Sequence, residues 1–159
     1  NSTSSLNNKK GYIVIEDDLS FENVKKNYPV LIQSESYNPL NQSNHVKLFS
    51  DDALKQAIEH CKSNISSNVT TFSWQNPSSI KKWILDNKIN ELEIIAPTIG
   101  KYEILIPSTL NKFDVKLSYY FHEWDLSFWK YADKGFFKLK KNIKNIVSPF
   151  WNTPLFGAP

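Results

Sequence analysis

Hydrophobic residues along this chain gather in five short runs. The runs at 30–32 and 92–96 have apolar residues on both of their faces, as in strands that are buried on both faces of a sheet. The last run alternates apolar with polar residues instead, which is the period of a half-buried strand. The five runs predict strands near residues 12–16, 30–33, 69–73, 92–96 and 115–121.

Between these runs, apolar residues recur every three or four positions, which is the spacing of one helix face. The clearest helix follows a cap at Ser50 or Asp51, after a brief extended piece at 45–49, and has Cys61 on its apolar side. Further helices are expected over residues 21–28 behind a Ser20 cap, from Pro77 with Ile80, Trp83 and Ile84 facing the core, and from about Tyr102 to Leu110.

The alternation of strands and helices indicates the fold class. Short connections and strands that are buried on both faces are typical of a parallel sheet between two layers of helices. We therefore predict an α/β fold: a three-layer, doubly wound, Rossmann-like and mainly parallel five-stranded sheet, with a C-terminal helix and an extended tail. The expected organisation is a disordered segment at 1–11, one α/β domain at 12–147 and an extended Pro- and aromatic-rich tail at 148–159.

The segment that follows the fifth strand is rich in aromatic residues and lysines. Asp125 is expected to cap a short turn from Leu126 to Ala132, and a helix is expected after Gly135. The lysines of that helix form either a phosphate-contacting surface with aromatic support or the solvated face of an amphipathic helix. For the second interpretation, cations near a helix C-terminus are favourable. The residues expected to form a partner or phosphate surface are Trp129, Phe137, Lys138, Lys140 and Lys144.

Composition changes this description little. A chain of 159 residues can build one domain with a proper core, and a formal net charge of +3 does not by itself indicate nucleic acid. The single cysteine, Cys61, is predicted to be an inert core thiol, so a cytoplasmic or other reducing compartment is expected. No apolar run approaches the length of about 20 residues that spans a membrane, and no membrane partner is expected.

In sheets of this kind, ligands bind beyond the carboxyl ends of the strands, which is the expected place for a site. The alternative interpretation is that these strand ends are polar only because they meet water. The chain has no GxGxxG motif after its first strand and no P-loop, so ordinary dinucleotide or triphosphate binding is not expected. The candidate ligand-binding residues at the strand ends are Glu16, Ser34, Trp74, Thr98, Glu123 and Trp124.

Catalytic and metal signatures are not apparent. The acidic run from Glu16 to Asp18 could hold a hard cation such as Mg²⁺, but an acidic strand end that leads into a capped helix is the preferred interpretation. The three histidines are far apart, with no cysteine at zinc-ligand spacing, and no nucleophile-elbow motif supports a catalytic triad. No catalytic residue and no metal site are therefore assigned.

Three segments, taken in order, resemble the α/β domain of the photolyase/cryptochrome flavoprotein family, in particular its divergent bacterial photolyase-related members. They are SNHVKLFSDDALKQAIEHC, KKWILDNKINELEIIAPTIGKYE and WDLSFWKYADKGFFKLKKNI. The resemblance covers roughly residues 12–147, and its most specific part is the run from Gly135 to Lys138.

The resemblance implies an accessory, non-catalytic domain of a DNA-repair or light-sensing flavoprotein. The family pairs this domain with a larger helical domain that holds flavin adenine dinucleotide (FAD), so the implied partner is that missing domain, and DNA would be contacted through the parent protein. No cofactor is expected in this chain, although an antenna pigment could occupy the strand-end site. The alternatives are a free-standing Rossmann-like module that binds a small molecule or nucleotide, and a fragment of an enzyme with an inter-domain active site.

Overall fold

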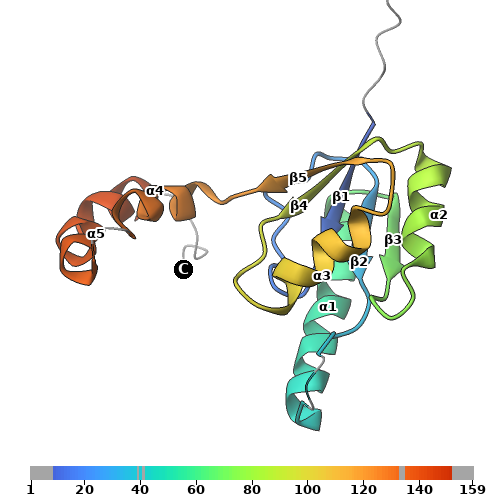
Figure 1. The fold of residues 1–159 in the computed structure, drawn as a ribbon, viewed down its shortest axis with the longest axis horizontal. Coiled ribbons are helices and arrows are strands. Elements are labelled where there is room, and N and C mark those ends of the chain that lie inside the picture. Colours follow the sequence, from blue (N-terminus) through green and yellow to red (C-terminus); the bar gives the residue numbers. More distant parts are fainter. Residues whose placement is uncertain (1–8, 39, 41, 133–134, 152–159) are drawn as a thin grey trace, which may run out of the picture. The chain divides into compact units, whose positions relative to one another are not determined.

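The computed structural model describes residues 9–38, 40, 42–132 and 135–151 (Figure 1). The chain forms two compact units, one up to Tyr120 and the other from Phe121 onward. The predicted domain at 12–147 includes residues of both units. Lys10 and Gly11, which were expected to precede the domain, form the start of its first strand.

The first unit is built on one five-stranded sheet in which all strands are parallel. The strand order is β3-β2-β1-β4-β5, so the predicted doubly wound sheet is confirmed. Its centre is apolar on both faces, and every residue of β2 is buried. The strands are β1 (Lys10–Val14), β2 (Val30–Gln33), β3 (Val69–Phe72), β4 (Glu91–Ile95) and β5 (Lys116–Tyr120).

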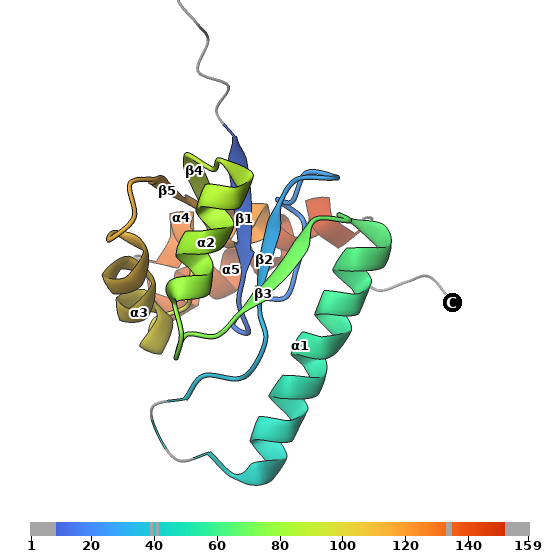
Figure 2. The ribbon, with the colours of Figure 1, turned by 90° about the vertical axis from the view of Figure 1, so that its right-hand side faces the viewer.

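Two hydrophobic clusters lie on the two faces of this sheet, giving the predicted three layers (Figure 2). Helices α2 (Ser78–Asn87) and α3 (Lys101–Leu110) cover one face and contribute Ile80 and Ile106 to the larger cluster. Helix α1 (Asn44–Asn64) covers the other face with Cys61. Cys61 is fully buried, as predicted, and burial raises the pKa of its thiol to about 11.

Trp83 of α2 lies in the core, as predicted, with 3% of its surface exposed. Its indole packs directly on the backbone of β1 at Gly11, where an added Cβ would come within 2.6 Å of Cη2 of Trp83. The small size of Gly11 therefore allows α2 to approach the sheet closely.

The helix predicted over residues 21–28 does not form. This segment is a series of turns, and Asn27 has a φ of 65°, which a continuing right-handed helix cannot contain. Asp18 accepts a hydrogen bond from the backbone N–H of Ser20, so the side chain that precedes Ser20 directs the turn. Phe21 and Val24 pack against the smaller hydrophobic cluster from this loop, and their spacing reflects that packing instead of a helix face.

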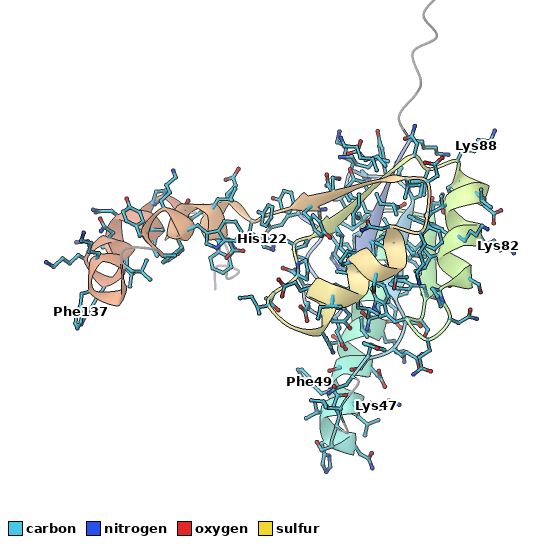
Figure 3. The ribbon with its side chains drawn as sticks, viewed as in Figure 1. Lys47, Phe49, Lys82, Lys88, His122 and Phe137 are labelled. Atoms are coloured by element: carbon cyan, nitrogen blue, oxygen red, sulfur yellow. The ribbon has the colours of Figure 1, made fainter. Side chains whose placement is uncertain are left out.

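Helix α1 begins earlier than predicted. Ser43 is its N-cap and accepts a hydrogen bond from the backbone N–H of Val46, so residues 45–49 are helical and not extended. The side chains of Leu48 and Phe49 in these first turns are exposed, and Figure 3 shows Lys47 and Phe49 in the same exposed part of α1. The first turns therefore have no buried face, which is why apolar periodicity does not reveal them.

The second unit is a pair of helices, α4 (Glu123–Ala132) and α5 (Phe136–Trp151). The start of α4 at Glu123 puts Asp125 inside its first turn, so Asp125 is not the predicted cap. The helix predicted after Gly135 is confirmed, but it continues to Trp151 through Pro149, so the first four residues of the predicted extended tail are helical. The rest of that tail, 152–159, lies outside the described residues.

Candidate functional site

The strand order places a topological switch point between β1 and β4. The chain crosses from β1 toward β2 on one side and from β4 toward β5 on the other, and a crevice forms at such a point beyond the carboxyl ends of the strands. Glu16 follows β1, Thr98 follows β4, and Lys101 begins α3. The short connections therefore bring these side chains to one edge of the sheet.

Glu16 is the centre of the polar contacts at this edge, and only 10% of its side chain is exposed. Its Oε1 accepts hydrogen bonds from the ammonium group of Lys101, from the Tyr102 hydroxyl at 2.6 Å and from the backbone N–H of Tyr37 at 3.2 Å. The Lys101 ammonium group also donates to the backbone carbonyl of Tyr37. Glu16 and Lys101 therefore fasten the segment after β2 to the start of α3.

The second carboxylate oxygen of Glu16, Oε2, is buried and has no hydrogen-bond partner among the described residues. A buried charged oxygen without a donor is costly, and in most proteins it is satisfied by water or by a ligand. This atom is therefore the part of the switch point where a donor group could still be added.

Gln33, at the end of β2, connects this network to the core, and its side chain is fully buried. Its Oε1 accepts hydrogen bonds from the backbone N–H of Glu16 and from Nε1 of Trp74, both at 3.2 Å. Its Nε2 donates to the Glu35 carbonyl at 2.7 Å and to the Tyr102 hydroxyl at 2.9 Å. One amide thus holds the ends of β1 and β2, the loop after β3 and α3 together.

The ionisation of this network is set by burial and by its own contacts. Burial raises the pKa of Glu16, but the hydrogen bonds from Lys101 and Tyr102 lower it. The lowering is the larger effect, so the pKa of Glu16 lies below its usual range. Burial, together with the Glu16 carboxylate, strongly raises the pKa of the Tyr102 hydroxyl. Tyr102 therefore remains a neutral donor and Glu16 a charged acceptor, an arrangement that holds loops in place instead of transferring protons.

The predicted strand-end residues divide between the two units. Glu16 and Trp74 belong to the network at the switch point, and Trp74 is buried against Phe72 and Tyr102. At the same ends of the strands, the hydroxyl of Ser34 donates to the Phe72 carbonyl and that of Thr98 to Asp17. The two remaining residues, Glu123 and Trp124, lie in α4 of the second unit.

The candidate ligand-binding residues expected from the sequence did not include Gln33, Lys101 or Tyr102. Gln33 is the one polar residue that ends a fully buried strand, and such a residue needs internal partners. Lys101 and Tyr102 directly follow Gly100, where α3 begins, but their pairing with Glu16 spans 85 and 86 residues. Only the signal for Gln33, a polar residue at the end of a buried strand, could have been found without the tertiary structure.

Among the described residues, no group of three or more His, Cys, Asp or Glu side chains could hold a metal ion.

Acid should weaken the first unit through Glu16. Because the pKa of Glu16 is lowered in the folded state, its stabilisation is present above the unfolded pKa of about 4.3 and is lost as the pH falls through the folded pKa. The free-energy difference between wild type and Glu16→Gln, measured by urea denaturation, should therefore be larger at about pH 7 than at about pH 3. The exposed Glu59→Gln is the matched control. An equal difference for Glu16→Gln at both pH values would exclude the ionised contact as the cause.

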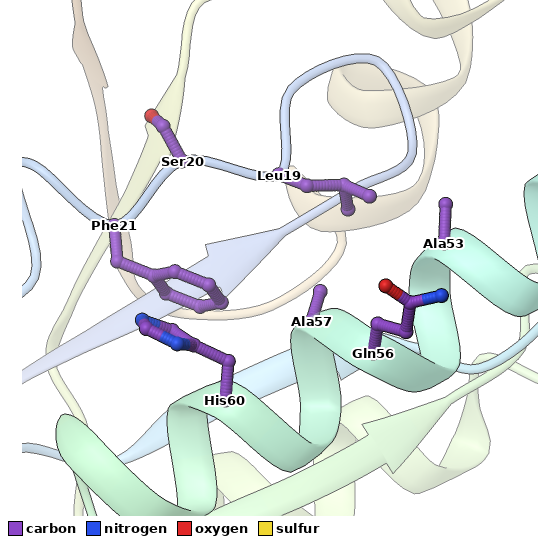
Figure 4. Close-up of a pocket in the computed structure, with 7 residues that line it drawn as sticks. All are labelled: Leu19, Ser20, Phe21, Ala53, Gln56, Ala57 and His60. Carbon is purple, nitrogen blue, oxygen red and sulfur yellow. The ribbon is translucent and has the colours of Figure 1, made fainter. Parts of the chain in front are cut away.

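An open groove lies elsewhere on the first unit, between the loop after β1 and helix α1 (Figure 4). Its volume is about 570 Å³, Ala53 and Ala57 of α1 line one side, and the Phe21 ring lies 5.8 Å from the ring of His60. The Ser20 hydroxyl, which is buried without a partner among the described residues, points away from α1 in Figure 4. No convergent set of polar groups lines this groove, so it is a weaker candidate than the switch point.

The second unit carries exposed aromatic side chains on α4. We call Phe121, which precedes α4, and Trp124 and Trp129 of α4 the α4 aromatic surface. Trp124 is 48% exposed and contacts the ring of Phe128 edge-on and that of His122 in a stacked arrangement. Trp129 is 54% exposed and contacts the ring of Phe121 edge-on. These rings are partly ordered by one another but remain open to solvent. Exposed rings that gather in this way are typical of interaction surfaces.

Comparison of the chain with models of protein families, with curated proteins and with solved structures found no match. Among the described residues, no helix has both the length and the apolar character needed to cross a membrane.

Proposed function

We propose that this chain is an accessory, non-catalytic α/β domain of a photolyase/cryptochrome-like flavoprotein that acts in DNA repair or light sensing. Two features support the proposal. Three segments of the sequence resemble that domain in order, and the chain forms a parallel α/β sheet in which one of these segments supplies β4 and the start of α3. The parent protein would be similar to a deoxyribodipyrimidine photolyase.

The observation that carries this proposal is the α4 aromatic surface. Fully burying a large apolar side chain is worth about 1.5–3 kcal/mol, so a partner that covered the two half-exposed tryptophans would gain a favourable contribution from each. The partner that we propose for this surface is the helical domain of the same protein. That domain would hold FAD, and DNA would be contacted through the parent protein.

The switch point supports a non-catalytic role. Its crevice is occupied by the chain's own side chains, with Glu16, Gln33, Trp74 and Tyr102 bonded to one another. The Oε2 of Glu16, which has no partner among the described residues, could accept one further hydrogen bond there. The family resemblance implies an antenna pigment as the ligand at this location. We propose no cofactor bound elsewhere in this chain.

The same oxygen favours a second candidate, a free-standing Rossmann-like module that binds a small molecule. Such a ligand would bring an N–H or O–H donor to Glu16 at the switch point. Equilibrium dialysis of the chain against cell metabolites should then recover one ligand, and Glu16→Gln should release it. If the chain is instead an accessory domain without a pigment, no ligand should be retained in this dialysis.

The coding region that contains this sequence tests the leading proposal directly. We expect it to encode an adjoining, mostly helical region of several hundred residues, and we expect the product of the whole region to purify with flavin absorbance. The 159-residue chain alone should purify colourless. A coding region without such a helical part, or stoichiometric flavin on the short chain, would contradict the proposal.

The role of the α4 aromatic surface can be tested separately with Trp129→Ser. Because Trp129 is half exposed in the isolated chain, this change should reduce self-association in sedimentation velocity and leave the thermal midpoint unchanged. Phe49→Ser, which removes another exposed ring from α1, is the matched control and should leave self-association as it is in wild type. A lowered midpoint for Trp129→Ser would show that the ring instead stabilises the fold.

A further inference from the structure

Helix α5 has an uneven charge distribution. It contains four lysines and no acidic residue, and all four lysines lie among its first nine residues. The positive end of a helix dipole is its N-terminus, and its effect is confined to about the first turn, where it disfavours Lys138. Like charges four apart, such as Lys140 and Lys144, repel one another. The four lysines are exposed, as the solvated-face interpretation expects, but they do not lie near the C-terminus of α5.

The two faces of α5 are occupied differently. Leu139, Ile146 and Phe150 recur at helical spacing and are buried or half-buried, because this face packs against α4. Residues 137, 140, 141 and 144 follow the spacing i, i+3, i+4 and i+7 and therefore share another face. All four are exposed, and we call Phe137, Lys140, Lys141 and Lys144 the α5 basic face.

None of the three lysines of this face has a carboxylate partner among the residues that the structure describes. The acidic residues in the described part of the second unit, Glu123 and Asp125, lie in the first turn of α4, where they complement its dipole. The charge of the α5 basic face is thus not balanced within the described part of this unit. An anionic partner would offset the repulsion between these lysines.

We propose that the α5 basic face binds the phosphate backbone of single-stranded nucleic acid. Three lysines within two turns can contact successive phosphates, and the ring of Phe137, 78% exposed and drawn at the end of the unit in Figure 3, offers a surface on which an unpaired base can stack. An anionic membrane is a poorer fit, because the apolar face that would enter the lipid is packed on α4. The inference does not rest on the accessory-domain proposal, which uses the α4 aromatic surface.

The test uses the full chain and fluorescein-labelled oligothymidylate and oligouridylate of about 20 nucleotides, with binding followed by fluorescence anisotropy. Affinity should fall with salt with a slope of log K against log salt near −2, the value expected for about three phosphate contacts on a single strand. The triple variant Lys140→Glu, Lys141→Glu and Lys144→Glu should lower affinity at least about tenfold. Its circular dichroism should match that of wild type, because all three side chains are exposed.

The matched control changes the net charge equally but elsewhere. Lys47, Lys55 and Lys82 are exposed lysines of α1 and α2, and their joint replacement by glutamate should lower affinity less than the α5 variant does. Equal loss in both variants, or no salt dependence, would overturn the proposal. So would retention of affinity in the α5 variant. Binding of wild type to vesicles of phosphatidylcholine with about one-third phosphatidylserine, with no binding to either oligonucleotide, would identify a membrane as the partner and would also overturn it.

Discussion

Replacing Trp83 with alanine should lower the free energy of unfolding by about 3–5 kcal/mol, the range observed when a large buried side chain is removed and its cavity cannot collapse. Trp83 is 3% exposed and lies between α2 and the backbone of β1. The cavity would open beside Gly11, which has no side chain to fill it, so little relaxation is expected. Urea denaturation followed by circular dichroism measures the loss.

Leu85→Ala is the control for this change. Leu85 lies on the same helix but is exposed, so its removal should change the free energy of unfolding by no more than about 0.5 kcal/mol. If Trp83→Ala costs as little as Leu85→Ala, the close packing of α2 on β1 is not what stabilises this face of the sheet.

Gln33→Leu should have the second-largest effect, a loss of about 2–4 kcal/mol, because the substitution keeps the volume but removes the hydrogen bonds at the switch point. Leucine in this position leaves Nε1 of Trp74 and the backbone N–H of Glu16 without their acceptor in a buried environment. Buried donors without a partner cost more than the net worth of the bonds that are lost. The measurement is again the free energy of unfolding in urea.

The same substitution at Gln56 provides a matched comparison. Gln56 is exposed on α1 and bonds only to Asp52 among the described residues, so Gln56→Leu should stay within about 0.5 kcal/mol of wild type. A cost for Gln33→Leu below about 1 kcal/mol would mean that the buried network contributes little, because its donors find other partners.

The buried position of Trp83 and the hydrogen bonds of Gln33 differ in whether the sequence alone could reveal them. The place of Trp83 in the core follows from its spacing with Ile80 and Ile84, since an apolar helix face must be buried wherever the helix lies. The role of Gln33 does not follow from spacing. Its partners Glu16, Trp74 and Tyr102 lie 17, 41 and 69 residues away, and only the strand order brings them together.

By itself, the sequence of this protein determined the α/β class, the five strands and the helices α2 and α3, because local periodicity fixes which residues one element can bury on one face. The early start of α1 and the turns at residues 21–28 depended on packing. Exposed first turns carry no apolar signal, and a loop can bury apolar residues at helical spacing. The pairing of Glu16 with Lys101 was decided only by the tertiary structure. Charge partners and the location of helix ends depend on contacts between distant residues, which no local pattern encodes.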